Sequence, residues 1–314
     1  MIPGNQYHEN EELEVSIMSV LAYFDLFNFP ITQEEIYLFM NRRCTVDSMC
    51  SALVSLTERK VVYKTGIYYA VKNDNYLSER REKGAAKAAE LLQVAQKVSA
   101  LLVKFPFVRG IGVSGSLSKK YADENSDIDF FIITKTGKLW IARTFLHLFK
   151  KLTFLFHKED YFCMNYFVDE ANAEIREQNY FTAVETVTLI PMQGDVAFEM
   201  FYAQNTWTRC YLPNNVLRIT HARTTRPGLF KIAIEALFNN AVGRWLNKRL
   251  MVITAKRWQK KTDQGKLNDR GIVMSMMACE GCSKPHPANF QRKVLEDHQR
   301  NLARLTERLK LFVA

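Results

Sequence analysis

A Gly-Ser pair followed by two closely spaced aspartates is the part of this sequence best suited to chemistry. Gly115 and Ser116 follow an apolar run that ends at Val113, and Asp127 and Asp129 open the next apolar run. A glycine lets the backbone approach a phosphate and permits a positive φ, while a serine there offers a hydroxyl and a free amide at a helix start. Alternation along a strand places both carboxylates on one face, which suits Mg²⁺ or Mn²⁺ shared with a phosphate substrate.

These residue types predict metal-assisted chemistry on a nucleotide. Metal ions held by the two aspartates would align an attacking oxygen with an α-phosphate and offset the charge of the leaving pyrophosphate. Lys119 and Lys120 lie in the same loop, where an ammonium can contact triphosphate oxygens as a point charge. The alternative for both lysines is a solvated position on the loop.

The same pattern resembles a known superfamily. Gly115-Ser116, roughly ten further residues and then Asp127-x-Asp129, set between two strands, resemble the nucleotidyltransferases of the DNA polymerase β type, and among them the smaller bacterial and archaeal nucleotidyltransferase-domain proteins. The resemblance covers roughly residues 105–200. It implies a short mixed sheet with flanking helices, and transfer of a nucleoside monophosphate from an NTP, such as ATP, to a hydroxyl or phosphate. Gly115 and Ser116 would then hold the phosphates, and Asp127 and Asp129 the metal.

Active members of that superfamily usually add a third carboxylate, on a later strand, as the base for the acceptor hydroxyl. The strand expected over residues 161–168 is followed by Asp169, whose position in the alternation matches, and we assign it this role. Asn165 stands in mid-strand, where an acid would be expected. The alternative to an enzyme is therefore a catalytically silent nucleotide-binding or regulatory protein. The acceptor and the preferred NTP are not specified by the sequence.

The first 77 residues have the element order of a winged helix-turn-helix module. Thr32 and Glu35 form a capping-box pattern that opens the second of three expected helices, and residues around Gly66 read as a hairpin. The third helix, residues 46–59, carries Asp47 and Glu58 but no Lys or Arg between 46 and 58. That helix is a poor surface for phosphates, so a packing or partner module competes with DNA binding.

The rest of the chain divides into three further parts, and the whole is expected to be an α+β protein. Residues 78–104 predict a linking helix that Gly84 could interrupt, residues 105–208 the nucleotidyltransferase-like core, and residues 209–314 a basic helical region. The expected elements of the core and tail are strands over 107–115, 128–134 and 161–168, and helices over 138–152, 179–190, 196–204, 229–260 and 288–312. Residues 179–214, which include Glu185, are a candidate for the far wall of a nucleotide cleft, with plain packing as the alternative.

Positive charge is concentrated in the tail. The chain has 43 Lys and Arg against 33 Asp and Glu, for a net charge of +10, and fourteen basic residues against three acids fall between Arg209 and Arg270. Trp245 and Trp258 lie in the same segment. A nucleic acid bound to residues 209–270 is one interpretation, and an amphipathic helix with its charges in water is the other.

The amino-acid composition limits the classes of protein to which this chain can belong. The apolar fraction of 47% and the charged fraction of 24% are ordinary for a globular chain. Apolar runs fall short of the roughly 18 residues that a membrane span needs, and the acidic N-terminus is unlike a signal peptide. We therefore expect a cytoplasmic protein without a membrane partner.

The cysteines give little support for a metal site. Six cysteines are too few for a disulfide scaffold, and we expect reduced thiols. Cys279 and Cys282 precede His286, but a structural zinc site needs four ligands, and His298 would have to come from a helix. Buried or loop thiols are the favoured reading of this pair.

Overall fold

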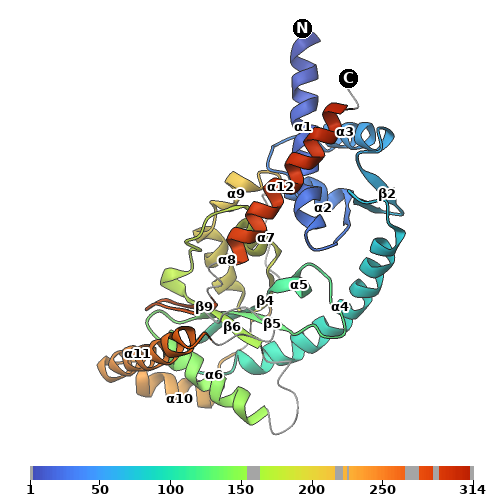
Figure 1. The fold of residues 1–314 in the computed structure, drawn as a ribbon. Helices are drawn as coiled ribbons and strands as arrows, with labels where there is room; N and C mark the ends of the chain where they lie inside the picture. Colours follow the sequence, from blue (N-terminus) through green and yellow to red (C-terminus); the bar gives the residue numbers. More distant parts are fainter. Residues whose placement is uncertain are drawn as a thin grey trace.

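The structure is a computed structural model that describes residues 3–153, 163–215, 222–224, 226–265, 276–285 and 290–311. Within these residues the chain is an α+β protein, as the sequence predicted, with a central mixed sheet surrounded by helices. Figure 1 shows that the two termini lie at one end of the molecule and helices α10 and α11 at the other. The sheet and the candidate site lie between these ends.

The central sheet has six described strands in the order β7-β4-β5-β6-β9-β8. Strands β5 and β6 are parallel and every other pair is antiparallel. The strands are β4 (Val108–Val113), β5 (Asp129–Thr134), β6 (Cys163–Asp169), β7 (Ile190–Gln193), β8 (Met276–Ala278) and β9 (Cys282–Pro285). The sequence predicted β4, β5 and β6. It missed β7, of which only Ile190 had been assigned to the end of a helix, and the hairpin β8–β9, which lies in a region expected to be helical.

The N-terminal part has the predicted order of three helices and a hairpin. Its elements are α1 (Pro3–Asp25), β1 (Ile31–Thr32), α2 (Gln33–Phe39), α3 (Val46–Glu58), β2 (Tyr63–Thr65) and β3 (Tyr68–Ala70). The capping box is confirmed, because the Thr32 side chain accepts from the Glu35 amide and the Glu35 carboxylate accepts from the Thr32 amide. Gly66 turns the hairpin with a φ of +60°.

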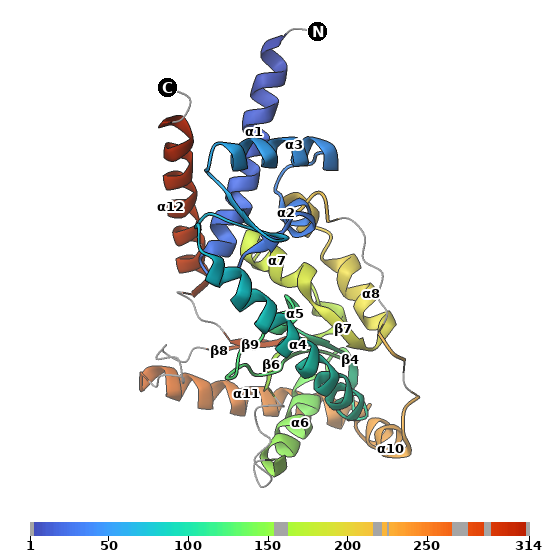
Figure 2. The ribbon, with the colours of Figure 1, turned by 90° about the vertical axis from the view of Figure 1, so that its right-hand side faces the viewer.

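The N-terminal part does not have a hydrophobic core of its own. Its buried cluster includes Tyr180 and Val184 of α7 (Tyr180–Thr188) and Leu305 of α12 (Phe290–Leu311). Helix α12 runs along α1 in both views (Figures 1 and 2), and His298 Nε2 lies 2.8 Å from the Ser19 carbonyl oxygen. The tail is therefore split: α12 joins the N-terminal part, while α10 and α11 stay at the opposite end.

The linking helix α4 (Asn75–Leu102) continues through Gly84, which does not interrupt it. A Cβ at Gly84 would lie 2.3 Å from the Tyr121 ring, and the Gly84 carbonyl accepts the Ala122 amide at 3.1 Å. Glycine is needed because the loop that carries the sequence motif packs directly on the helix backbone. The glycine therefore marks a close contact, where we had considered a helix break.

Arg81 of α4 ties the N-terminal part to that loop. Its side chain is buried, and its Nη2 lies 2.8 Å from Glu35 Oε1. Its Nη1 donates to the Lys119 carbonyl at 3.0 Å, and its guanidinium lies 3.8 Å from the centre of the Phe29 ring. A single buried cation thus fixes the motif loop relative to α2.

The remaining described helices pack against the sheet or follow it. They are α5 (Gly115–Ser118), α6 (Leu139–Thr153), the 3₁₀ turn η3 (Glu170–Asn172), α8 (Asp195–Gln204), α9 (Thr208–Tyr211), α10 (Leu229–Phe238) and α11 (Ala241–Asp263). The single helix expected over 229–260 is two helices, because Asn240 caps α11 by accepting the Gly243 amide at 3.0 Å. No helix among the described residues is long and apolar enough to span a membrane.

Two of the cysteines expected to be reduced form a disulfide. Cys279 and Cys282 are joined across the turn between β8 and β9. This corrects the expectation of thiols at both positions and removes them as zinc ligands, while His286 lies outside the described residues. The described residues contain no group of three or more His, Cys, Asp or Glu side chains that could hold a metal ion.

The buried His147 on α6 leads us to expect that the protein loses stability in acid. Burial first, and then the charges of Arg143, Lys150 and Lys151, lower its pKa from 6.5 to about 3. Between those two values the unfolded chain binds a proton that the folded chain does not, so the free energy of unfolding falls as the pH falls from 6.5 toward 3. At pH 5 this costs roughly 2 kcal/mol.

We expect His147→Gln to remove that part of the pH dependence. The measurement is urea unfolding of both proteins at a series of pH values from neutral to mildly acidic. Parallel curves for the wild-type and variant proteins would contradict the assignment.

Candidate functional site

The Gly-Ser turn and the second aspartate of the motif lie directly against each other. Gly115 opens the short helix α5 with a φ of +71°, and a Cβ built there would lie 2.8 Å from Asp129 Oδ2. The Ser114 amide donates to the Asp129 carbonyl at 2.9 Å, which extends the β4–β5 ladder by one bond. The sequence spacing therefore brings Gly115 and Asp129 together as predicted, and a side chain larger than glycine would displace the carboxylate.

Asp127 and Asp129 flank a fully buried Ile128 at the start of β5, as alternation predicted. Asp127 is exposed and Asp129 is half-buried. The negative charges of both carboxylates affect the pKa of Cys163. This cysteine is the first residue of the parallel strand β6 and pairs with Asp129. Burial first, and then the Asp129 charge, a hydrogen bond to Asp129 and the Asp127 charge, raise the pKa of this thiol to about 12. Both negative charges therefore act at the end of the sheet where the parallel strands β5 and β6 begin.

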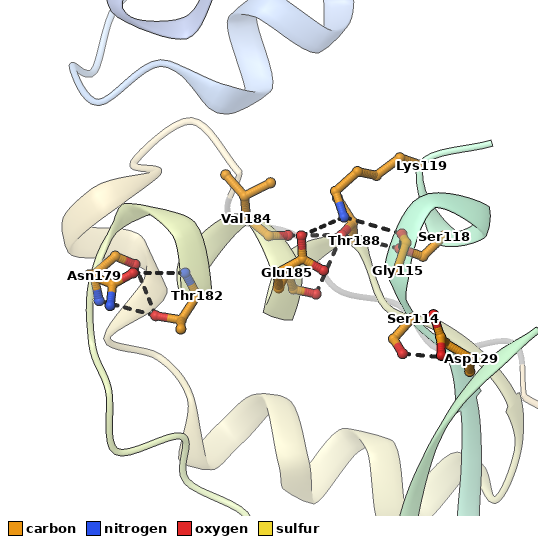
Figure 3. Close-up of polar contacts among 10 residues, drawn as sticks. All are labelled: Ser114, Gly115, Ser118, Lys119, Asp129, Asn179, Thr182, Val184, Glu185 and Thr188. Atoms are coloured by element: carbon orange, nitrogen blue, oxygen red, sulfur yellow. Dashed lines mark hydrogen bonds and ion pairs between the residues drawn. The ribbon is translucent and has the colours of Figure 1, made fainter. Parts of the chain in front are cut away.

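Lys119 lies at the site but is held by an ion pair. Its Nζ is 2.7 Å from Glu185 Oε1 of α7 and 3.2 Å from the Gly115 carbonyl oxygen (Figure 3). Ser118 Oγ also donates to that carbonyl, at 2.8 Å, and lies 3.4 Å from Thr188 Oγ1. These contacts dock α7 on the Gly-Ser turn and place Glu185 across from Asp129.

Two cavities meet at this point. The first, of about 330 Å³, is lined by Asp129, Tyr166 and Thr182 and by the ion pair of Glu177 with Lys284. The second, of about 320 Å³, opens toward the N-terminal part, and its lining includes Ser116 and Lys119. Besides rings from α7 and α12, five aromatic rings line it, namely those of Tyr23, Phe24, Phe27, Phe29 and Tyr121. Five residues border both cavities, namely Gly115, Asp129, Phe181, Glu185 and Phe290. Each cavity is large enough for a small ligand.

Other residues singled out in the sequence have different positions. Ser116 is exposed on the rim of the second cavity, and Lys120 is exposed beyond it with a φ of +56°. Within 179–214, Glu185 does form a wall of the cavities, but Tyr180 and Asn205 serve packing: Tyr180 Oη donates to the Phe39 carbonyl at 2.8 Å, and Asn205 is buried. Within this range the cavity wall thus comes mainly from α7, and Leu189 and Phe201 also line the first cavity.

Asp169 is not brought to the site. Strands β5 and β6 are parallel, so Asp129 pairs with Cys163 at one end and Thr134 pairs with Asp169 at the other. The Asp169 carboxylate is buried and accepts three hydrogen bonds, from the Gly137 amide at 3.1 Å, the Asn172 amide at 3.0 Å and Asn172 Nδ2 at 2.8 Å. Alternation from Cys163 predicted that Asp169 would share a face with Asp129, but the register shift between Met164 and Tyr166 pairs it with Thr134. Asp169 therefore lies on the opposite face of the sheet as well as at the other end of the strand. The geometry argues against the assigned role of base and identifies Asp169 as a cap for the loops at that end.

The position beside Asp129 is a cysteine, not an acid. Cys163 opens β6, and Asn165 follows two residues later at the point where the β5–β6 register shifts, between Met164 and Tyr166. The acid that borders both cavities besides Asp129 is Glu185, which comes from a helix. Sequence reasoning placed Glu185 in a cleft wall but assigned it no role, since only a strand position was considered for the third carboxylate.

Asp169→Ala is expected to destabilise the protein without changing its chemistry. Removing a buried carboxylate that accepts three hydrogen bonds leaves the Gly137 and Asn172 amides unsatisfied, at a cost of about 3 kcal/mol in the free energy of unfolding. Chemical denaturation measures this loss. Loss of any activity at unchanged stability would instead restore Asp169 as a functional residue.

The basic segment lies away from these cavities. Its exposed charges are concentrated on the outer side of α11, at Arg244, Lys248, Arg249, Lys256, Arg257, Lys260 and Lys261. Lys231, by contrast, is buried, and Arg218, Lys266 and Arg270 fall outside the described residues.

Comparison of the chain with protein-family models, with curated proteins and with solved structures finds no match in any of the three. The functional argument therefore depends on the site itself.

Proposed function

We propose that this protein is a Mg²⁺-dependent nucleotidyltransferase, which moves a nucleoside monophosphate from an NTP to an acceptor. The observation that carries the proposal is the contact of Gly115 with the Asp129 carboxylate at the junction of two cavities. A reaction that joins two substrates at one phosphorus atom needs two adjoining cavities with a charged group where they meet.

The donor set fits the metal that the resemblance implies. Mg²⁺ is commonly held by one or two carboxylates, with substrate phosphates and water completing its shell. Asp127 and Asp129 supply two carboxylates, one on each side of the buried Ile128 where β5 begins. When bound there, the metal would neutralise phosphate charge and orient the reacting oxygens; Mn²⁺ would serve equally.

The two cavities suggest a division between donor and acceptor. The second cavity combines Ser116 and Lys119 with aromatic rings, of which that of Phe27 is exposed, a set that suits a triphosphate and a stacked base. We assign the NTP to it and the acceptor to the first cavity. In this arrangement Glu185 keeps the Lys119 ammonium at the boundary, where it can contact the departing phosphates.

One observation favours a second candidate, a silent nucleotide-binding protein. Cys163 occupies the position beside Asp129, and Asp169 lies at the far end of β6. In the enzyme, the base would be Glu185, which borders both cavities and would have to leave Lys119 to accept a proton. In the silent protein, the Lys119–Glu185 pair stays intact and the site only binds.

A labelling experiment separates the two candidates. The full chain is incubated with α-³²P-labelled NTPs, Mg²⁺ and acceptors of several classes: RNA, hydroxyl-rich small molecules, protein hydroxyls and sugar phosphates. Transfer of label with release of pyrophosphate supports the enzyme. NTP binding without transfer to any acceptor, in the wild-type protein and in Glu185→Gln alike, would contradict it.

A further inference from the structure

Helix α10 exposes its apolar side chains and turns its charged ones toward the protein, the reverse of an ordinary surface helix. Its outer face is apolar: Leu229 is 87% exposed, Leu237 61% and Phe230 58%. The two charged residues within its bounds, Lys231 and Glu235, face the protein instead. A helix on a globular protein normally buries its apolar stripe and exposes its charges. This face is therefore built to meet something other than water.

Polar contacts fix α10 in this orientation. Lys231 Nζ donates to the carbonyl oxygens of Val103 at 2.9 Å and Val108 at 2.6 Å. The Glu235 carboxylate accepts two bonds from the Arg109 guanidinium, at 2.9 and 2.8 Å. Rotating the apolar residues inward would break all of these contacts and leave the half-buried Arg109 guanidinium without the Glu235 carboxylate. The exposure of the apolar face is therefore specified by the fold.

The adjoining helix α11 adds aromatic and basic residues on its outer side. Val242 is 63% exposed and Trp245 59% exposed, and the Arg249 guanidinium lies 5.4 Å from the centre of the Trp245 ring. Six further basic side chains are exposed along the helix, at Arg244, Lys248, Lys256, Arg257, Lys260 and Lys261. Asp263, its last residue, is its sole acid.

We propose that the outer faces of α10 and α11, the α10–α11 surface, bind an anionic lipid bilayer. Apolar side chains of an interfacial helix enter the boundary of the acyl chains, tryptophan occupies the headgroup level, and lysine and arginine contact the lipid phosphates. The two adjoining helices supply each of these groups. This departs from our expectation of no membrane partner, which rested on the lack of a spanning segment; the helices here lie on the bilayer.

Charge distinguishes this occupant from two others. A second copy joined through the same surface would bring the basic residues of both α11 helices together, and like charges oppose that contact. A nucleic acid would attract the basic residues of α11, but it would leave Leu229, Phe230 and Leu237 in water. An anionic bilayer accommodates both the apolar and the basic groups.

Co-sedimentation of the full chain with vesicles tests the proposal. Vesicles of phosphatidylcholine alone are compared with vesicles that also contain phosphatidylglycerol. Two double variants remove one component each, Leu229→Ser with Phe230→Ser and Lys248→Glu with Arg249→Glu. Matched controls on other helices are Val196→Ser, at a residue that is 66% exposed on α8, and Lys83→Glu on the exposed side of α4.

We expect the wild-type protein and both controls to bind the anionic vesicles and to bind neutral ones weakly. Each double variant should lower the partition coefficient between vesicles and water about tenfold or more. Binding to vesicles should also shift the Trp fluorescence of the wild-type protein to shorter wavelength, and it should not do so in Trp245→Phe. The proposal is overturned if wild-type protein stays in the supernatant, or if the variants bind equally well. It is also overturned if Leu229→Ser with Phe230→Ser instead dissociates a dimer, or if α11 binds nucleic acid and not vesicles.

Discussion

Replacing Asp129 with asparagine is expected to lower nucleotidyl transfer about a thousandfold, or about 4 kcal/mol of transition-state stabilisation. Asparagine keeps the shape of the side chain and the backbone bond from the Ser114 amide to the Asp129 carbonyl, so the fold should be retained. What is lost is the negative charge closest to Gly115, where the proposed metal and the two cavities meet. The measurement is the rate of label transfer at saturating Mg²⁺ and NTP.

Glu124→Gln is the matched control for this variant. Glu124 is an exposed acid on the same loop and lines neither cavity. Its neutralisation should leave the transfer rate within about twofold of wild type, since an exposed charge outside the site contributes little. Equal losses in Asp129→Asn and Glu124→Gln would mean that the loop's overall charge, and not a metal ligand, matters.

Gly115→Ala is expected to lower transfer about a hundredfold by moving the Asp129 carboxylate. Alanine at a φ of +71° costs about 1–2 kcal/mol of stability. Its Cβ would also lie 2.8 Å from Asp129 Oδ2, so the carboxylate has to shift. A displacement near 1 Å in a catalytic group can cost about a hundredfold in rate.

The variant Gly137→Ala separates the effect of backbone strain at a positive φ from the effect of displacing the Asp129 carboxylate. Gly137 has a φ of +66°, and a Cβ there would meet nothing within 4 Å. We expect a similar loss of stability in the two alanine variants, measured by urea unfolding, but a loss of transfer in Gly115→Ala alone. If transfer falls equally in both, the effect comes from reduced stability and the contact with Asp129 is unimportant.

The parts of the fold that follow from local rules were predicted from the sequence. The capping box at Thr32 and Glu35, the hairpin at Gly66 and the strand that begins at Asp129 each depend on residues close together in the chain. The meeting of Gly115 with Asp129 was also predicted, because a turn and an adjacent strand keep a fixed spacing.

What the sequence did not specify depends on contacts between distant residues. The hairpin β8–β9 is two short strands whose position is set by pairing with β6, and no local pattern marks it. Simple alternation predicted that Asp169 would share a face with Asp129, but it could not foresee the register shift in β6, which puts Asp169 on the opposite face and at the other end of the strand. Glu185 enters the site only because α7 docks on the Gly-Ser turn through Lys119. The outward-facing apolar side of α10 likewise depends on partners more than a hundred residues away.

The most direct test of the account is the binding of Mn²⁺ together with a non-hydrolysable NTP analogue, followed by electron paramagnetic resonance. This measurement needs no knowledge of the acceptor and reports on the site in both the active and the silent protein. We predict that wild-type protein and Asp169→Ala bind Mn²⁺ in the presence of the analogue, and that Asp127→Asn with Asp129→Asn weakens this binding about a hundredfold or more. Undiminished Mn²⁺ binding in that double variant, or none in the wild-type protein, would contradict the proposed site.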